Sequence, residues 1–152
     1  MFVNYKIIDA AKGLISSSLA LNNKTNWSIY GQFDITDKTG INMPCIKVLC
    51  FNEEPQYKES NLGLHKAELQ ILTFAYSLLG TNTGEGTTAN EFETVSDMVI
   101  NPFLNNSASV TLQNYTNNLQ ILNINENGLE STPLNDGWFA NQKFEVVCSR
   151  TE

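Results

Sequence analysis

Hydrophobic and polar residues alternate along two long segments of the chain, residues 43–51 and 65–77. The second segment has two alternating sets of residues, one for each face of a strand. One set is Ala67, Leu69, Ile71 and Thr73, and the other is Lys66, Glu68, Gln70 and Leu72. A period of two residues is typical of a β-strand with one wet face. Both segments are also apolar on both faces in part. We therefore expect them to be the central strands of a sheet that helices cover.

A polar segment, residues 52–63, joins these two strands. It is too long for a two-residue hairpin turn, so we expect an exposed arm of low intrinsic stability that becomes ordered on a partner. The candidate interface residues on this arm are Glu53, Glu54, Pro55, Tyr57 and Lys58. Trp138 and Phe139 are adjacent in another predicted strand, so they face opposite ways. One of the pair is expected in the core, and Phe139 is the further candidate for an interface anchor.

An amphipathic helix is predicted over residues 2–21. Its apolar stripe consists of Val3, Ile7, Ile8, Ala11, Leu14, Ile15, Ser18 and Leu19. The spacing of this stripe follows the helical period, and we expect it to pack on the sheet. Asn22 and Asn23 are expected to end the helix, because asparagine tolerates a left-handed backbone conformation.

A second helix is predicted over residues 90–104. Its packing face consists of Phe92, Val95, Met98, Val99 and Phe103. Two pairs can form the capping box at its start, Thr88 with Glu91 or Asn90 with Glu93. Acidic residues also suit the first turn of a helix, because they interact favourably with its dipole.

Three further strands are predicted at residues 26–35, 118–125 and 138–149. Between the last two, Asn127 and Gly128 form a strong local turn signal. The predicted order is therefore helix, strand, two long strands, helix and two strands. This order favours an α+β fold in a single domain over all 152 residues. We expect a mostly antiparallel sheet of about four to five strands, with a long central hairpin, packed by two helices.

The charge of the chain limits its function. The formal net charge is −7 at pH 7 and the isoelectric point is about 4.6. A domain that grips nucleic acid normally has a basic face and a high isoelectric point. Such a role is therefore disfavoured, although an acidic surface is compatible with DNA that passes by without binding.

Few residues in the chain are suited to chemistry. Cys45, Cys50 and Cys148 lie in apolar strand contexts, so we expect buried thiols in a reducing compartment. His65 is the one histidine, and no nucleophile or carboxylate is fixed near it by spacing. The glycine-rich segment at residues 80–89 lacks the Gly-Lys-Ser/Thr ending of a phosphate-binding loop. We therefore expect no catalytic residue, no metal site and no cofactor, and a structural or binding role. No segment is expected to span a membrane.

The order of elements resembles that of the small tail-terminator, or tail-completion, proteins of long-tailed bacteriophages. The matching stretches are residues 42–49 (NMPCIKVL), 67–74 (AELQILTF), the helix at 91–104 and residues 142–147 (QKFEVV). The likeness covers nearly the whole chain and is a pattern of elements without a diagnostic motif. The chain departs from it in the Asn-rich segment at 105–118 and the connector at 80–89.

The resemblance implies a virion structural protein that forms a ring, usually a hexamer, at the head-proximal end of a phage tail. Its partners would be further copies of itself, the tail-tube protein that it caps, and the neck or head-completion proteins. DNA would pass through the lumen without specific binding. The protein would assemble in the host cytoplasm and reside in the tail and neck of the virion.

The sequence leaves other functions open. One is a different neck or connector ring protein of a phage particle. Another is a small α+β ligand-binding domain with a pocket around Trp27, Phe33 and Trp138. The least favoured is an enzyme that uses His65.

Overall fold

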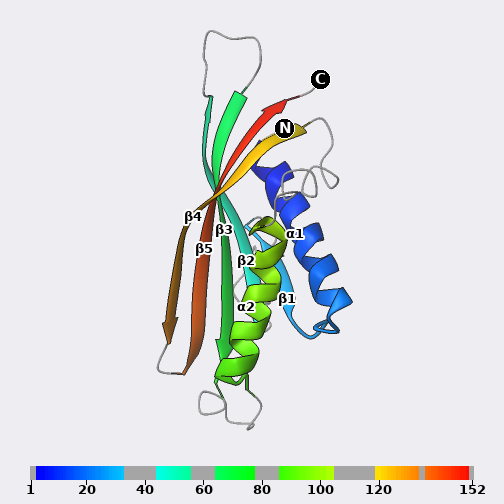
Figure 1. Cartoon of the computed structure of the whole chain (residues 1–152), viewed down its shortest axis with the longest axis vertical. Helices are drawn as coiled ribbons and strands as arrows, with labels where there is room; N and C mark the ends of the chain where they lie inside the picture. The colour runs from blue at the N-terminus through cyan, green and yellow to red at the C-terminus, as the bar shows by residue number, and fades with distance from the viewer. Residues whose placement is uncertain are drawn as a thin grey trace.

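The computed structural model describes residues 3–32, 44–55, 64–77, 86–104, 119–133 and 136–150. Its elements are α1 (Val3–Leu21), β1 (Ser28–Gly31), β2 (Cys45–Pro55), β3 (Leu64–Tyr76), α2 (Ala89–Leu104), β4 (Leu119–Pro133) and β5 (Gly137–Arg150) (Figure 1). This is the predicted order, and the predicted α+β class is confirmed.

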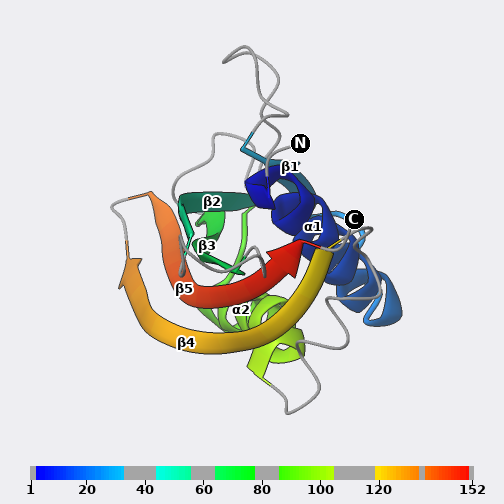
Figure 2. The same cartoon turned by 90° about the horizontal axis from the view of Figure 1, so that it is seen from above.

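The strands form one five-stranded sheet in the order β1-β2-β3-β5-β4. β1 pairs parallel to β2, and the other neighbouring strands pair antiparallel. β5 follows all the other strands in sequence, yet it lies inside the sheet between β3 and β4. Seen along the long axis of the molecule, β4 and β5 sweep through broad arcs (Figure 2).

Both helices pack on the same face of the sheet. α1 lies against β1 and β2, and α2 lies against β3 and β5 (Figure 1). The two helices also contact each other, and the Ser18 hydroxyl donates a hydrogen bond of 2.9 Å to the carbonyl oxygen of Met98. The largest side chains buried between the helices and the sheet are Phe144, Ile7, Ile15, Ile46, Leu69 and Ile71. The apolar stripes predicted for the two helices therefore form one core with the strands.

α1 ends where the asparagines were expected to end it. Asn23 has a φ of 58°, in the left-handed region. The Asn22 side-chain amide donates a hydrogen bond of 2.8 Å to the carbonyl oxygen of Ser18, one of the last carbonyls of the helix. These two residues turn the chain and supply a partner for a helix-end carbonyl.

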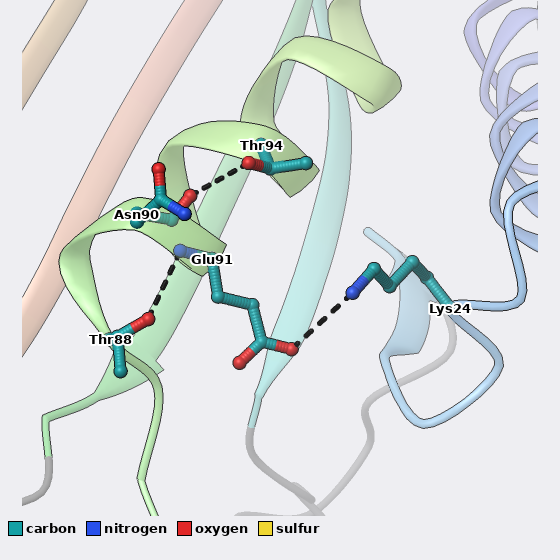
Figure 3. Close-up of polar contacts among 5 residues, drawn as sticks. All are labelled: Lys24, Thr88, Asn90, Glu91 and Thr94. Carbon is teal, nitrogen blue, oxygen red and sulfur yellow. Dashed lines mark hydrogen bonds and ion pairs between the residues drawn. The ribbon is translucent and has the colours of Figure 1, made fainter.

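Thr88 caps the start of α2. Its hydroxyl oxygen accepts a hydrogen bond of 3.2 Å from the backbone N–H of Glu91, as Figure 3 shows. Thr88, the cap of the first predicted pair, is therefore the capping residue, and Asn90 lies inside the helix. The Glu91 carboxylate points to Lys24, at 3.8 Å, which links the start of α2 to the turn after α1 (Figure 3).

Two predictions about chain reversals need correction. Residues 52–55, predicted as the start of the arm, continue strand β2, in which Glu54 pairs with Lys66 beyond a register shift. The Asn127-Gly128 pair, predicted as a turn, lies within β4 as a register irregularity. There Gly128 adopts a φ of 119°, and the buried Gln142 amide donates to its carbonyl oxygen at 2.9 Å. A long-range hydrogen bond thus holds a bulge where the local sequence favours a turn.

Candidate functional site

The face of the sheet opposite the helices is a candidate interaction surface. We call it the open face and define it by the outward residues Lys47, Leu49, Phe51, Lys66, Glu68, Gln70, Leu72, Phe74, Phe139, Asn141, Lys143, Glu145 and Val147. They alternate with residues that face the helices, because successive strand residues point to opposite sides. Both described helices pack on the other face.

The open face contains apolar side chains that are only half-buried. These are Leu49, Phe51, Leu72, Phe74, Phe139 and Val147. The rings of Phe74 and Phe139 pack together, with centroids 5.0 Å apart and planes tilted by 44°. Apolar side chains gathered on an exposed face are typical of a protein–protein contact surface.

A line of polar side chains crosses the same face. The Gln70 amide nitrogen donates to the Glu68 carboxylate at 2.9 Å, and the Asn141 amide nitrogen donates to the Gln70 amide oxygen at 3.3 Å. Because an ionised carboxylate only accepts hydrogen bonds, Glu68 fixes the orientation of Gln70, and Gln70 fixes that of Asn141. The Asn141 Oδ1 is buried and is left as an acceptor without a hydrogen-bond partner, and Asn141 as a whole is 8% exposed.

Lysines on the open face differ in their pairing. Lys66 Nζ lies 3.0 Å from the Glu145 carboxylate on the neighbouring strand. Lys47 and Lys143 lie on β2 and β5, on either side of β3. Within the part of the chain that the structure describes, neither forms an ion pair. They therefore give the centre of the open face two cationic groups that are available to a partner.

The helix side of the molecule has a different character. The exposed charged residues of the two helices are Asp9 on α1 and Glu93 and Asp97 on α2, all acidic. A groove of about 540 Å³ lies between the helices, lined by Leu14, Ser17, Ser18, Leu21, Asn22, Met98, Asn101 and Pro102. Leu21 is 85% exposed at its rim.

The candidate interface residues do not come together in one patch. Glu53, Glu54 and Pro55 lie at the end of β2, and Tyr57 and Lys58 lie outside the described residues. Phe139 pairs with Phe74, while Pro55 pairs with His65. From His65 to Phe74 the strand advances nine residues, roughly 30 Å. Phe139 is on the open face, as expected from its position next to Trp138, which points to the helices. It is nevertheless far from the end of the hairpin.

The tryptophans proposed to line a pocket belong to the core or pack against it. Trp138 is partly buried against the core, where its Nε1 donates to the carbonyl oxygen of Thr87 at 3.0 Å and its ring lies tilted beside Phe92, with centroids 6.4 Å apart. Trp27 is 4% exposed within the hydrophobic core, and Phe33 lies outside the described residues. The groove between the helices is lined by other residues.

The three cysteines are buried thiols outside any disulfide, as predicted. Burial raises the pKa of the Cys45 thiol above its ordinary value, and the neighbouring Lys47 only partly offsets this. A thiol with a raised pKa is a poor nucleophile. Cys45 and Cys50 pair with Phe74 and Leu69, residues of opposite parity on β3, so the two thiols face opposite sides of the sheet.

Neither metal-binding chemistry nor a membrane helix emerges from the described ranges. No group of three or more His, Cys, Asp or Glu residues in them is placed to hold a metal ion. No helix there is long and apolar enough to cross a membrane. His65 pairs through its backbone with Pro55 and Cys148, and its side chain is outside the described part. No protein-family model matches the chain, and no curated protein matches it.

Sequence reasoning missed the middle of the open face. The sequence signal for it was Leu72 and Phe74, which are apolar residues on the same strand face as the charged Lys66 and Glu68. That pattern was attributed to a helical cover, whereas both helices pack on the other face. Asn141 had no local signal, since its role depends on Gln70, which is far away in sequence.

Proposed function

We propose that this protein is a virion structural protein that forms a ring, a hexamer, at the head-proximal end of a phage tail. In this role it caps the tail tube and joins it to the proteins of the neck. DNA passes through the ring without specific binding.

One observation carries the proposal: the sheet has helices on one face and half-buried apolar side chains on the other. The two sides of the molecule are therefore chemically different. Identical subunits that pack head to tail need two different complementary surfaces, and such packing closes into a ring when the rotation between subunits permits it. The order of elements, which resembles that of tail terminators, supports the same role.

The charge of the chain also supports the proposal. Sixteen acidic residues against nine lysines and arginines give the net charge of −7. A ring around DNA requires a lumen that does not hold phosphates, and an acidic protein repels them. The raised pKa of the Cys45 thiol is in keeping with a role that performs no reaction.

The test is the mass distribution of the purified chain, alone and mixed with the tail-tube protein of the same phage. Mass photometry over a concentration series should show a closed oligomer, and negative-stain electron micrographs should show rings. With tube protein present, the rings should sit at one end of the tubes and limit their length. A chain that stays monomeric at every concentration and on tubes contradicts the proposal. Binding to a portal or adaptor protein in place of the tube would indicate a connector ring.

A further inference from the structure

We infer that the open face of one copy binds the outer side of α2 on the next copy. This inference rests on the proposed ring, and it names the two surfaces that build the ring. The occupant of the open face is then a second copy of this chain, bound through a helix.

Charge complementarity identifies the helix. The open face offers Lys47 and Lys143, which have no ion pair among the described residues. The exposed side of α2 offers Glu93 and Asp97, which are four residues apart and therefore on the same side of the helix. α1 is less suitable, because Lys6 and Lys12 accompany its one exposed acidic residue.

The polar line on the open face adds groups that a helix can contact. Glu68 and Gln70 are half-buried, so they are still in part open to a docked surface. The exposed side of α2 carries Asn90 and Asn101, whose amide groups can both donate and accept hydrogen bonds. An acidic helix with interspersed amides thus matches both the lysines and the polar line.

Apolar contacts fit the same arrangement. The open face presents Leu72 and the Phe74–Phe139 pair, half-buried. On α2, Leu104 is 47% exposed and Met98 is half-buried. Each copy offers one surface of each kind, so the contact is heterologous and repeats from copy to copy.

Charge reversal tests the inference. Lys143→Glu disables the open face, and Asp97→Lys disables the helix surface. Each variant alone should weaken self-association by about tenfold or more, because like charges then face each other across the contact. In an equimolar mixture, a contact between one variant and the other joins either two unchanged surfaces or two charge-reversed ones. The mixture should therefore recover rings of alternating subunits, and the recovery should weaken as salt is raised.

Controls separate the possible failures. Asp9→Lys reverses an exposed acidic charge on α1, which belongs to neither surface, and should leave the oligomer unchanged. Thermal unfolding of each variant verifies the fold, and Lys47→Glu replaces Lys143→Glu if the latter does not fold. A wild-type chain that is always monomeric refutes the ring itself. A wild-type ring that survives both reversals, or a mixture that fails to recover, refutes only this assignment of surfaces.

Discussion

The Gln142 side-chain amide donates a hydrogen bond of 2.9 Å to the carbonyl oxygen of Gly128. Gln142 is 1% exposed, on the inner strand β5, whereas Gly128 belongs to the bulge of the edge strand β4. The same amide nitrogen lies 3.1 Å from the carbonyl oxygen of Lys143. A buried donor thus satisfies a carbonyl that the bulge removes from the ladder.

Replacing Gln142 with methionine should lower the free energy of unfolding by about 1–2 kcal/mol, because the donor is lost while the volume is kept. The exposed position of Gly128 keeps the effect moderate, since water can reach its carbonyl. Urea unfolding followed by circular dichroism measures the change. Asn125→Ala, at an exposed position of β4, the strand that contains Gly128, should change stability by less than about 0.5 kcal/mol. Equal effects of the two substitutions would contradict the role given to Gln142.

Thr88→Ala should destabilise the protein by about 1 kcal/mol, because it removes the acceptor for the Glu91 backbone N–H. Asn90→Ala is the matched control. Asn90 is exposed inside α2, where alanine has the higher helix propensity, so this change should be neutral or slightly stabilising. Unfolding curves of both variants in urea decide the matter. If Asn90→Ala were the more harmful change, the alternative capping pair would be correct.

Stability should fall in alkaline solution, in part because of Cys45. The pKa of this thiol is raised by burial in the folded state. As pH rises past the ordinary thiol value of about 8.5, the unfolded chain loses the proton while the folded chain retains it, so unfolding becomes more favourable. The stabilisation is complete below that pH and is lost as pH rises through the folded-state pKa.

Cys45→Ala isolates this effect. The difference in unfolding free energy between wild type and variant, measured in reductant, should be largest near neutral pH and should shrink above about pH 9. Cys50 and Cys148 remain in both proteins, so their contributions cancel. A difference that stays constant from neutral to alkaline pH would show that Cys45 does not titrate in this way.

Replacing residues 56–63 with a short Gly-Ser linker should leave the monomer folded. The paired part of the hairpin extends to Pro55 and His65, and these residues are retained. If the segment becomes ordered on a neighbour, as its composition predicts, the variant should lose rings in size-exclusion chromatography and electron micrographs. Its melting temperature should stay close to that of the wild type. Intact rings from this variant would remove the segment from the subunit contact.

Local patterns in the sequence predicted most of the elements. The period-two alternation around Leu69 located β3, and the spacing of the apolar residues around Ile7 and Ile15 located α1. Thr88 was one of two possible caps, because the capping box depends only on residues three apart. These features rest on interactions between near neighbours, which a single sequence contains.

Features that depend on distant residues could not be predicted in the same way. Asn127-Gly128 is typical of a turn, and only the hydrogen bond from Gln142 makes it a bulge. The strand order was equally hidden, because alternation does not say which strands become neighbours. The open face was suggested by apolar residues such as Leu72 on the wet parity, but the side on which the helices pack depends on long-range packing.

The position of β5 inside the sheet affects how the protein is made. Among the described strands β4 pairs with β5 alone, and β3 needs β5 to complete its second ladder. While residues 137–150 are still missing from a growing chain, β4 has no template and one side of β3 is bare. Translation must therefore reach the end of β5 before the sheet can close, so a prematurely terminated product would lack the part of the open face that β5 supplies.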